Sequence, residues 1–171
     1  WIVEAEIDGW RLDVADEVDY TVWQEARERL KRRFPDIILL GETWGNASML
    51  LQGNQLDIAM NYVFRDAVKD FFVNNIKPSE FDARLNRMLA EYYNEVNEAM
   101  YNLIDSHDTK RFLRECNENK RIFKLAVAFQ ILFCGSPAIY YGDEVGMTGD
   151  NDPDCRGAMI WDETKQDKDI L

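Results

Sequence analysis

Gly9-Trp10-Arg11-Leu12-Asp13-Val14 is the segment from which the fold class can be argued. Trp10, Leu12 and Val14 alternate with polar positions, which is the two-residue period of a β-strand. Asp13 lies on the face opposite Leu12 and Val14, where the strand ends. The same pattern, an apolar run followed by an acid, recurs at Glu42 and at Asp108. The chain therefore repeats a strand that leads into a carboxylate.

Strands of this kind alternate with amphipathic helices along the chain. Further strands are predicted at 37–40, 56–60, 101–104 and 138–141, and helices at 23–34, 81–92 and 122–133. Capping boxes at Thr21…Gln24 and Ser79…Asp82 are predicted to open the first two helices. Strict alternation favours a parallel sheet, either an open doubly wound sheet or a segment of a β/α barrel. No glycine-rich phosphate turn follows the first strand, which disfavours the open sheet.

The length and the first residues indicate a piece of a longer protein. A closed barrel needs eight strand–helix units in about 250 residues, whereas this chain has 171 residues. It starts without methionine at Trp1-Ile2-Val3-Glu4, which resembles the tail of a helix. We therefore expect an incomplete barrel with no second domain.

Composition excludes several classes of protein. Thirty-two acidic against 20 basic side chains give a net charge of −12, which disfavours binding to nucleic acid or to an anionic membrane. The longest apolar stretch, Leu125 to Cys134, is too short to span a bilayer. No signal peptide is visible, and three sparse cysteines favour reduced thiols over a disulfide framework. A cytoplasmic location is expected.

The informative carboxylates are Asp13, Glu42 and Asp108, which are separated by 29 and 66 residues. These intervals fit one and about two strand–helix units. In a β/α barrel the carboxyl ends of the strands surround one opening, so the three acids are expected to share a pocket. For any one of them, a helix N-cap or an ion-pair partner, for example of Arg11, is an equally good explanation.

Such a set of carboxylates suits glycoside hydrolysis. One ionised carboxylate attacks the anomeric carbon, while a second carboxyl group gives a proton to the leaving oxygen. Arg11 shares a strand face with Asp13 and is expected to keep it ionised. Glu42 is the better candidate for the proton donor. Asp108 is expected to stabilise positive charge in the transition state, with His107 bonded to sugar hydroxyls.

These residues resemble the motifs of the α-amylase family of glycoside hydrolases over essentially the whole chain. Residues 9–18 resemble its fourth-strand motif, 41–44 its fifth, 106–108 its seventh and 135–144 its eighth. Segments 15–18, 60–62 and 149–156 are similar to the neopullulanase, cyclomaltodextrinase and maltogenic amylase branch. The resemblance implies an α/β fold, with residues 1–171 forming strands 4 to 8 of a (β/α)8 TIM barrel and their helices. The third-strand motif is absent.

The resemblance also implies residue roles. Asp13 would be the nucleophile, Glu42 the general acid/base and Asp108 the transition-state stabiliser. Arg11 and His107 would support them. Trp44 and Glu17 would line acceptor subsites, although loop packing explains Trp44 equally well.

The implied partner is an α-glucan of the cyclodextrin, pullulan or starch type, cleaved with retention and without a cofactor. Acids 150–154 are a possible calcium site of the parent, with solvated loop charge as the simpler explanation. Asp16 and Gly45 depart from the branch, which usually has Asn at the first position and often His at the second, so bond preference stays open.

Two consequences follow for the isolated chain. One wall of the substrate site is missing, so little or no hydrolysis is expected. Unpaired strand edges and an uncovered apolar interior predict self-association. A glucanosyltransferase of the same family and a non-catalytic amylase-like binding domain remain as alternatives.

Overall fold

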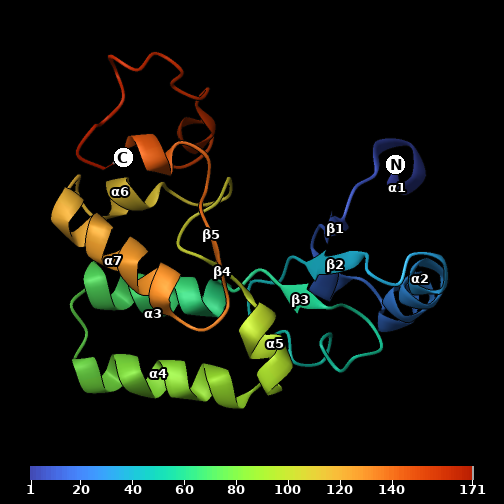
Figure 1. Ribbon diagram of the computed structural model, residues 1–171. Helices are drawn as coiled ribbons and strands as arrows, with labels where there is room; N and C mark the ends of the chain where they lie inside the picture. The colour runs from blue at the N-terminus through green and yellow to red at the C-terminus, as the bar shows by residue number, and fades with distance from the viewer. Residues whose placement is uncertain (171) are drawn as a thin grey trace.

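Five short parallel strands lie side by side in chain order in the computed structural model, which describes residues 1–170 (Figure 1). The strands are β1 (Gly9–Leu12), β2 (Ile38–Gly41), β3 (Ile58–Ala59), β4 (Tyr101–Leu103) and β5 (Ser136–Ala138). β1, β2 and β3 form a three-stranded sheet, and β4 and β5 form a two-stranded sheet. A parallel bridge between Met60 and Tyr101 joins the two sheets. Parallel strands in sequential order are the arrangement of a β/α barrel, so this part of the prediction is confirmed.

Helices connect the strands. They are α1 (Ile2–Ala5), α2 (Tyr20–Arg33), α3 (Tyr62–Phe72), α4 (Pro78–Ala90), α5 (Asn94–Ala99), α6 (Phe112–Glu115) and α7 (Lys120–Leu132). Three 3-10 turns are η1 (Ala15–Glu17), η2 (Asp143–Val145) and η3 (Asp154–Arg156). The predicted helices correspond to α2, α4 and α7, whereas α3 was not predicted. No helix of residues 1–170 is long and apolar enough to cross a membrane.

Several predicted boundaries are wrong. Helix α2 begins one residue before Thr21, because the carboxylate of Asp19 accepts a hydrogen bond from the Thr21 amide at 2.9 Å and caps the helix. Helix α4 begins at Pro78, whose fixed φ suits the first helical position, and no side chain caps it. The last strand ends at Ala138, where the sequence pattern placed its start.

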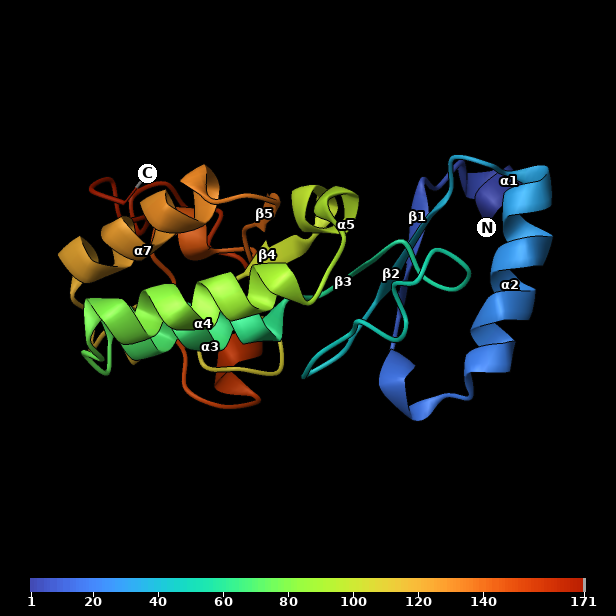
Figure 2. The same ribbon diagram turned by 90° about the horizontal axis from the view of Figure 1, so that it is seen from below.

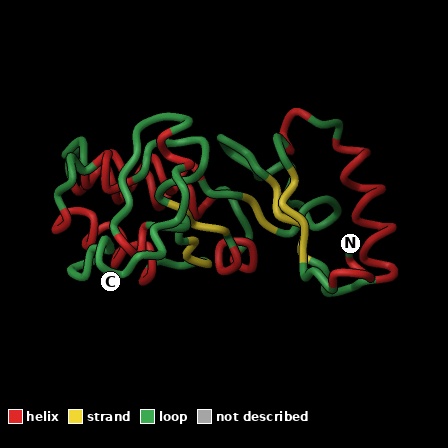
Figure 3. The backbone as a smooth tube through the Cα atoms, turned by 90° about the horizontal axis from the view of Figure 1, so that it is seen from above, coloured by secondary structure: helices red, strands yellow, loops and turns green. Residues whose placement is uncertain are grey.

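The buried side chains form two main clusters. Figure 2 shows α2 on one side of β1 and β2 and the helices α3, α4 and α7 on the other, and Figure 3 shows helices on both sides of the strands from the opposite direction. The larger cluster lies between α3, α4 and α7 and contains the aromatic side chains of Phe64, Phe81 and Phe123. The other lies where β1 to β3 meet α2 and the loop before β3, and includes Leu39 and Leu50. The three cysteines are unpaired, as predicted.

Candidate functional site

The ends of β1 and β2 place two of the predicted acids side by side. Leu12 is in register with Gly41, and the Glu42 amide donates to the Leu12 carbonyl at 2.8 Å. Asp13 and Glu42 therefore follow paired positions. The Arg11 guanidinium contacts both carboxylates, with Nη1 bonded to Asp13 and Nη2 lying 2.6 Å from Glu42 Oε1. Because one guanidinium reaches both, the two acids lie on the same side of the sheet.

The two carboxylates differ sharply in exposure. The Asp13 side chain is 75% exposed, whereas that of Glu42 is 3% exposed. The second oxygen of Glu42, Oε2, accepts the Val14 amide at 2.9 Å. Arg11 was predicted to keep Asp13 ionised. The structure adds a second contact, between Arg11 and the buried Glu42. Glu42 is thus fixed by two donors, while Asp13 is free on its solvent side.

The turn that follows Asp13 is held in an unusual backbone conformation. Val14 has φ 44° and ψ 49°, a left-handed geometry that costs a branched residue on the order of 1–2 kcal/mol. Its amide is bonded to the Glu42 side chain, and the next amide, of Ala15, donates to the Glu42 carbonyl at 2.9 Å. Glu42 therefore stabilises the turn that presents Asp13.

Asp108 lies in the loop after β4 and is contacted by a histidine and an arginine. His107 Nε2 is 2.9 Å from Asp108 Oδ2, and Arg156 Nη2 is 3.0 Å from Asp108 Oδ1. Arg156 Nε also donates to the His107 carbonyl at 3.0 Å. His107, which was predicted to bond sugar hydroxyls, is thus in contact with Asp108. Arg156 was not predicted as a site residue, although its segment was among those that resemble the branch.

Tyr62 links the two groups of acids. Its hydroxyl is 2.9 Å from Ser106 Oγ, and the side chain is buried. Burial raises the pKa of the Tyr62 phenol against the lowering effect of the Ser106 bond, and the negative charges of Glu42 and Asp108 raise it further. Carboxylates from both strand ends therefore act on one hydroxyl. The charges of Glu42 and Asp108 thus both reach Tyr62, a residue that the sequence analysis quoted without assigning it a role.

The two predicted subsite residues have different surroundings. The Trp44 ring stacks on Tyr62 with centroids 4.0 Å apart and planes at 16°, and the residue is 49% exposed. One face is packed and half of the residue meets solvent, so Trp44 is not a core residue. Glu17 lies exposed in η1, and its side chain makes no hydrogen bond or ion pair within residues 1–170. Nothing joins Glu17 to the three acids.

The acidic loop at 150–154 is neutralised by cations of the chain. Asp150 pairs with Lys110 at 2.6 Å and with Arg114 at 3.0 Å, and Asp152 pairs with Arg156 at 3.2 Å. No group of three or more His, Cys, Asp or Glu side chains is placed to hold a metal ion in the part of the chain that the structure describes.

Comparison with known proteins gives a consistent family. The profile described as "Alpha amylase, catalytic domain" matches residues 1–171. A cyclomaltodextrinase of a Bacillus species is 52% identical over the whole chain and 31% of its own length. Neopullulanase 2 of Thermoactinomyces vulgaris is 48% identical over 99% of this chain and 29% of its own length. The intracellular maltogenic amylase of Bacillus subtilis is 43% identical over the whole chain and 29% of its length.

Solved structures agree with these sequence matches. The cyclic α-maltosyl-(1→6)-maltose hydrolase of Arthrobacter globiformis, in complex with its cyclic sugar, superposes with a TM-score of 0.95 at 38% identity. The match covers 98% of this chain and 38% of that protein. The chain thus spans about 30% of the length of the curated relatives named above. Because the family profile matches every residue, the chain belongs to the α-amylase catalytic domain family.

Proposed function

We propose that this chain carries the catalytic acids of a retaining α-glucan hydrolase, with Asp13 as nucleophile, Glu42 as general acid/base and Asp108 as transition-state stabiliser. The observation that carries the proposal is the single guanidinium of Arg11, which contacts both Asp13 and Glu42 at neighbouring strand ends. Retaining enzymes hold their two carboxyl groups only about 5–5.5 Å apart, and two carboxylates that bind one guanidinium suit that spacing.

The exposure of Asp13 suits its role, because Asp13 is open to solvent and can approach an anomeric carbon. Both oxygens of buried Glu42 accept bonds, from Arg11 and from the Val14 amide, so one of these bonds must open before Glu42 can carry a proton to the leaving oxygen. When Asp13 forms the glycosyl ester it loses its charge, and Arg11 is left with Glu42 as its only carboxylate partner. Glu42 would then act as the general base that removes a proton from the attacking water.

Asp108 would stabilise the oxocarbenium-like transition state from the adjacent loop. His107 and Arg156 fix both of its oxygens, so its charge is already oriented when the substrate binds. The half-exposed Trp44 ring would stack against a sugar in an acceptor subsite. A side chain at Gly45 would meet nothing within 4 Å, so the subsite beside Trp44 is open at this position.

We infer that the five strands are strands 4 to 8 of the barrel and that residues 1–171 are the C-terminal portion of the catalytic domain. The sequential parallel order and the one-third coverage of the relatives support this assignment. The substrate class follows from the names of those relatives, and is an α-glucan of the cyclodextrin, pullulan or starch type. The relative named as intracellular supports a cytoplasmic location.

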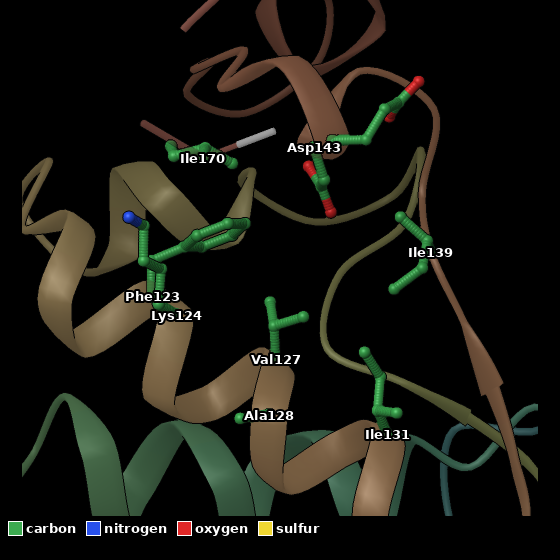
Figure 4. A pocket seen from close by; sticks show the side chains of 9 residues that line it. Phe123, Lys124, Val127, Ala128, Ile131, Ile139, Asp143 and Ile170 are labelled. Carbon is green, nitrogen blue, oxygen red and sulfur yellow. The ribbon is translucent and has the colours of Figure 1, made fainter. Parts of the chain in front are cut away.

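The isolated chain is expected to be inactive and to self-associate. β1 pairs only with β2, and β5 only with β4, which leaves two open edges within the described sheet. Apolar side chains of α7 are exposed, Leu132 at 85%. A groove of about 480 Å³ beside them is lined by apolar residues such as Phe123, Val127 and Ile131 (Figure 4). A monomer in sedimentation at micromolar concentration would contradict this expectation.

The test of the proposed roles is release of reducing ends from cyclodextrin and pullulan by the complete protein. Asp13→Asn, Glu42→Gln and Asp108→Asn should each reduce kcat by at least about 10³-fold, because each removes a group that acts in the transition state. Glu25→Gln, which changes an exposed carboxylate on α2, is the matched control and should retain full activity. Substantial activity in Asp13→Asn would refute the assignment.

A further inference from the structure

A second pair of carboxylates, Asp105 and Asp143, lies buried outside the site described above. Asp105 follows β4 and Asp143 begins η2, 38 residues later, and the two residues are 2% and 3% exposed. Their side chains lie within hydrogen-bonding reach of each other. The fully buried Arg111 donates from Nη1 to Asp143 Oδ1 at 3.3 Å and to the Tyr141 carbonyl at 2.7 Å. Arg111 therefore pairs with Asp143, and its charge also acts on Asp105.

One carboxylate oxygen of this pair lacks a donor, and Arg111 Nε and Nη2 are likewise buried without a partner among residues 1–170. Asp105 Oδ2 accepts the Phe112 amide at 2.6 Å, but the buried Oδ1 has no N–H or O–H donor among residues 1–170. A buried carboxylate oxygen without a donor is costly. A carboxyl proton between the two side chains supplies the missing donor and removes the repulsion between them.

The surroundings of the pair also favour a neutral carboxyl group. Besides Arg111, the charged groups that act on it are Arg65 of α3 and Glu144 of η2. The negative charge of Asp105 contributes to raising the pKa of the Cys116 thiol. Asp143 borders the apolar groove along α7, whose walls offer it few donors (Figure 4). Burial raises the pKa of both carboxyl groups, and that of Asp143 is raised further by the charge of Asp105.

We propose that Asp105 and Asp143 share one proton in a buried O–H···O bond, and that this bond fastens the loop that carries His107 and Asp108 to the turn at η2. The bond between Asp105 and the Phe112 amide closes that loop at its base. Inside the loop the Ser106 hydroxyl accepts the Asp108 amide at 3.1 Å. The pair would therefore act as a positioning device for Asp108, a role that rests on the proposed function, whereas the shared proton does not.

Infrared spectroscopy of the chain at neutral pH tests the shared proton. The proposal expects a carbonyl band from a neutral carboxyl group in the wild type. Asp143→Asn and Asp105→Asn should each remove that band, and Asp143→Asn keeps an amide donor in its place. Glu144→Gln alters the neighbouring exposed carboxylate, retains an acceptor for the Gly142 amide, and should keep the band. Absence of the band in the wild type, or its survival in both Asn variants, would overturn the proposal.

The pH dependence of the loop tests the positioning role. A native pKa raised above the unfolded value gives stability that is present at low pH and is lost as the pH rises through the native pKa. Above that pKa, amide exchange at Asp108 and Phe112 should accelerate in the wild type relative to Asp143→Asn, by up to tenfold per pH unit. The ratio to the variant cancels the intrinsic pH dependence of exchange. A ratio that stays constant with pH would refute the positioning role without bearing on hydrolysis by Asp13 and Glu42.

Discussion

Replacing Glu42 with glutamine should destabilise the chain far more than replacing Asp13 with asparagine, although both are proposed catalytic acids. Glu42 accepts one bond from Arg11 and one from the Val14 amide, and both of its oxygens are buried. Glutamine has one acceptor oxygen, so one of the two donors would face an amide NH2 group. A lost charge-assisted bond costs about 1.5–3 kcal/mol, and an unsatisfied buried donor costs about 1–3 kcal/mol.

These two costs overlap, and we expect Glu42→Gln to lower the free energy of unfolding by about 3 kcal/mol. Asp13 is largely exposed, and Arg11 keeps Glu42 as a partner when Asp13 is changed. Asp13→Asn should therefore cost no more than about 1 kcal/mol. With a urea m-value of about 2 kcal/mol per molar, the midpoint should fall by about 1.5 M for Glu42→Gln and by less than about 0.5 M for Asp13→Asn.

Urea denaturation followed by circular dichroism measures both midpoints on the same chain. Glu25→Gln, which removes the charge of an exposed i,i+4 pair on α2, serves as the control and should shift the midpoint by less than about 0.3 M. Equal midpoints for Glu42→Gln and Asp13→Asn would show that Glu42 does not hold the turn after β1. A larger fall of the urea midpoint for Asp13→Asn than for Glu42→Gln would contradict the assignment of Glu42 as the carboxylate that stabilises the turn.

Three further predictions concern other parts of the chain. Gly135→Ala should cost about 3 kcal/mol in urea titrations, because φ is 116° and a Cβ would clash with the buried Asn102 Nδ2. Gly53→Ala, with open space around it, should cost only about 1–2 kcal/mol. Burial raises the pKa of Asp57, but bonds from two cations of α2 and from a backbone amide outweigh it and lower the pKa. Asp57→Asn should therefore cost about 2 kcal/mol at pH 7, and the difference should begin to shrink near the unfolded pKa of about 4 and vanish only below the lowered native pKa. Iodoacetamide at pH 8 should alkylate exposed Cys134 in the folded chain and spare Cys116, whose pKa is raised by burial to about 12, and mass spectrometry of the labelled peptides checks this.

The sequence predicted those parts of the site that depend on local pattern. Asp13, Glu42 and Asp108 each follow an apolar run that forms a strand or ends one, and parallel strands in chain order bring such ends to one edge. The contact between Arg11 and Asp13 was predictable because residues two apart on a strand share a face. His107 and Asp108 are adjacent in sequence, and both were predicted as site residues.

Local sequence patterns did not predict the contacts between distant segments. Arg11 meets Glu42 only because of the register between β1 and β2, which no local pattern specifies. Arg156 reaches Asp108 from a loop 48 residues later. Asp105 and Asp143 looked like ordinary acids of an acidic chain until the fold buried them together. Helix α2 likewise begins before the predicted capping residue Thr21, because the Asp19 carboxylate accepts the Thr21 amide.

Trapping the covalent intermediate in the complete protein is the decisive experiment for the roles of Asp13 and Glu42. An activated fluorinated maltosyl substrate should slow breakdown of a glycosyl ester enough for peptide mass spectrometry to locate it. The sugar is expected on Asp13, with labelling abolished in Asp13→Asn and the ester accumulating in Glu42→Gln. Sugar attached to any other carboxylate, or turnover to a product of inverted configuration without an ester, would contradict the proposed pairing of these two acids.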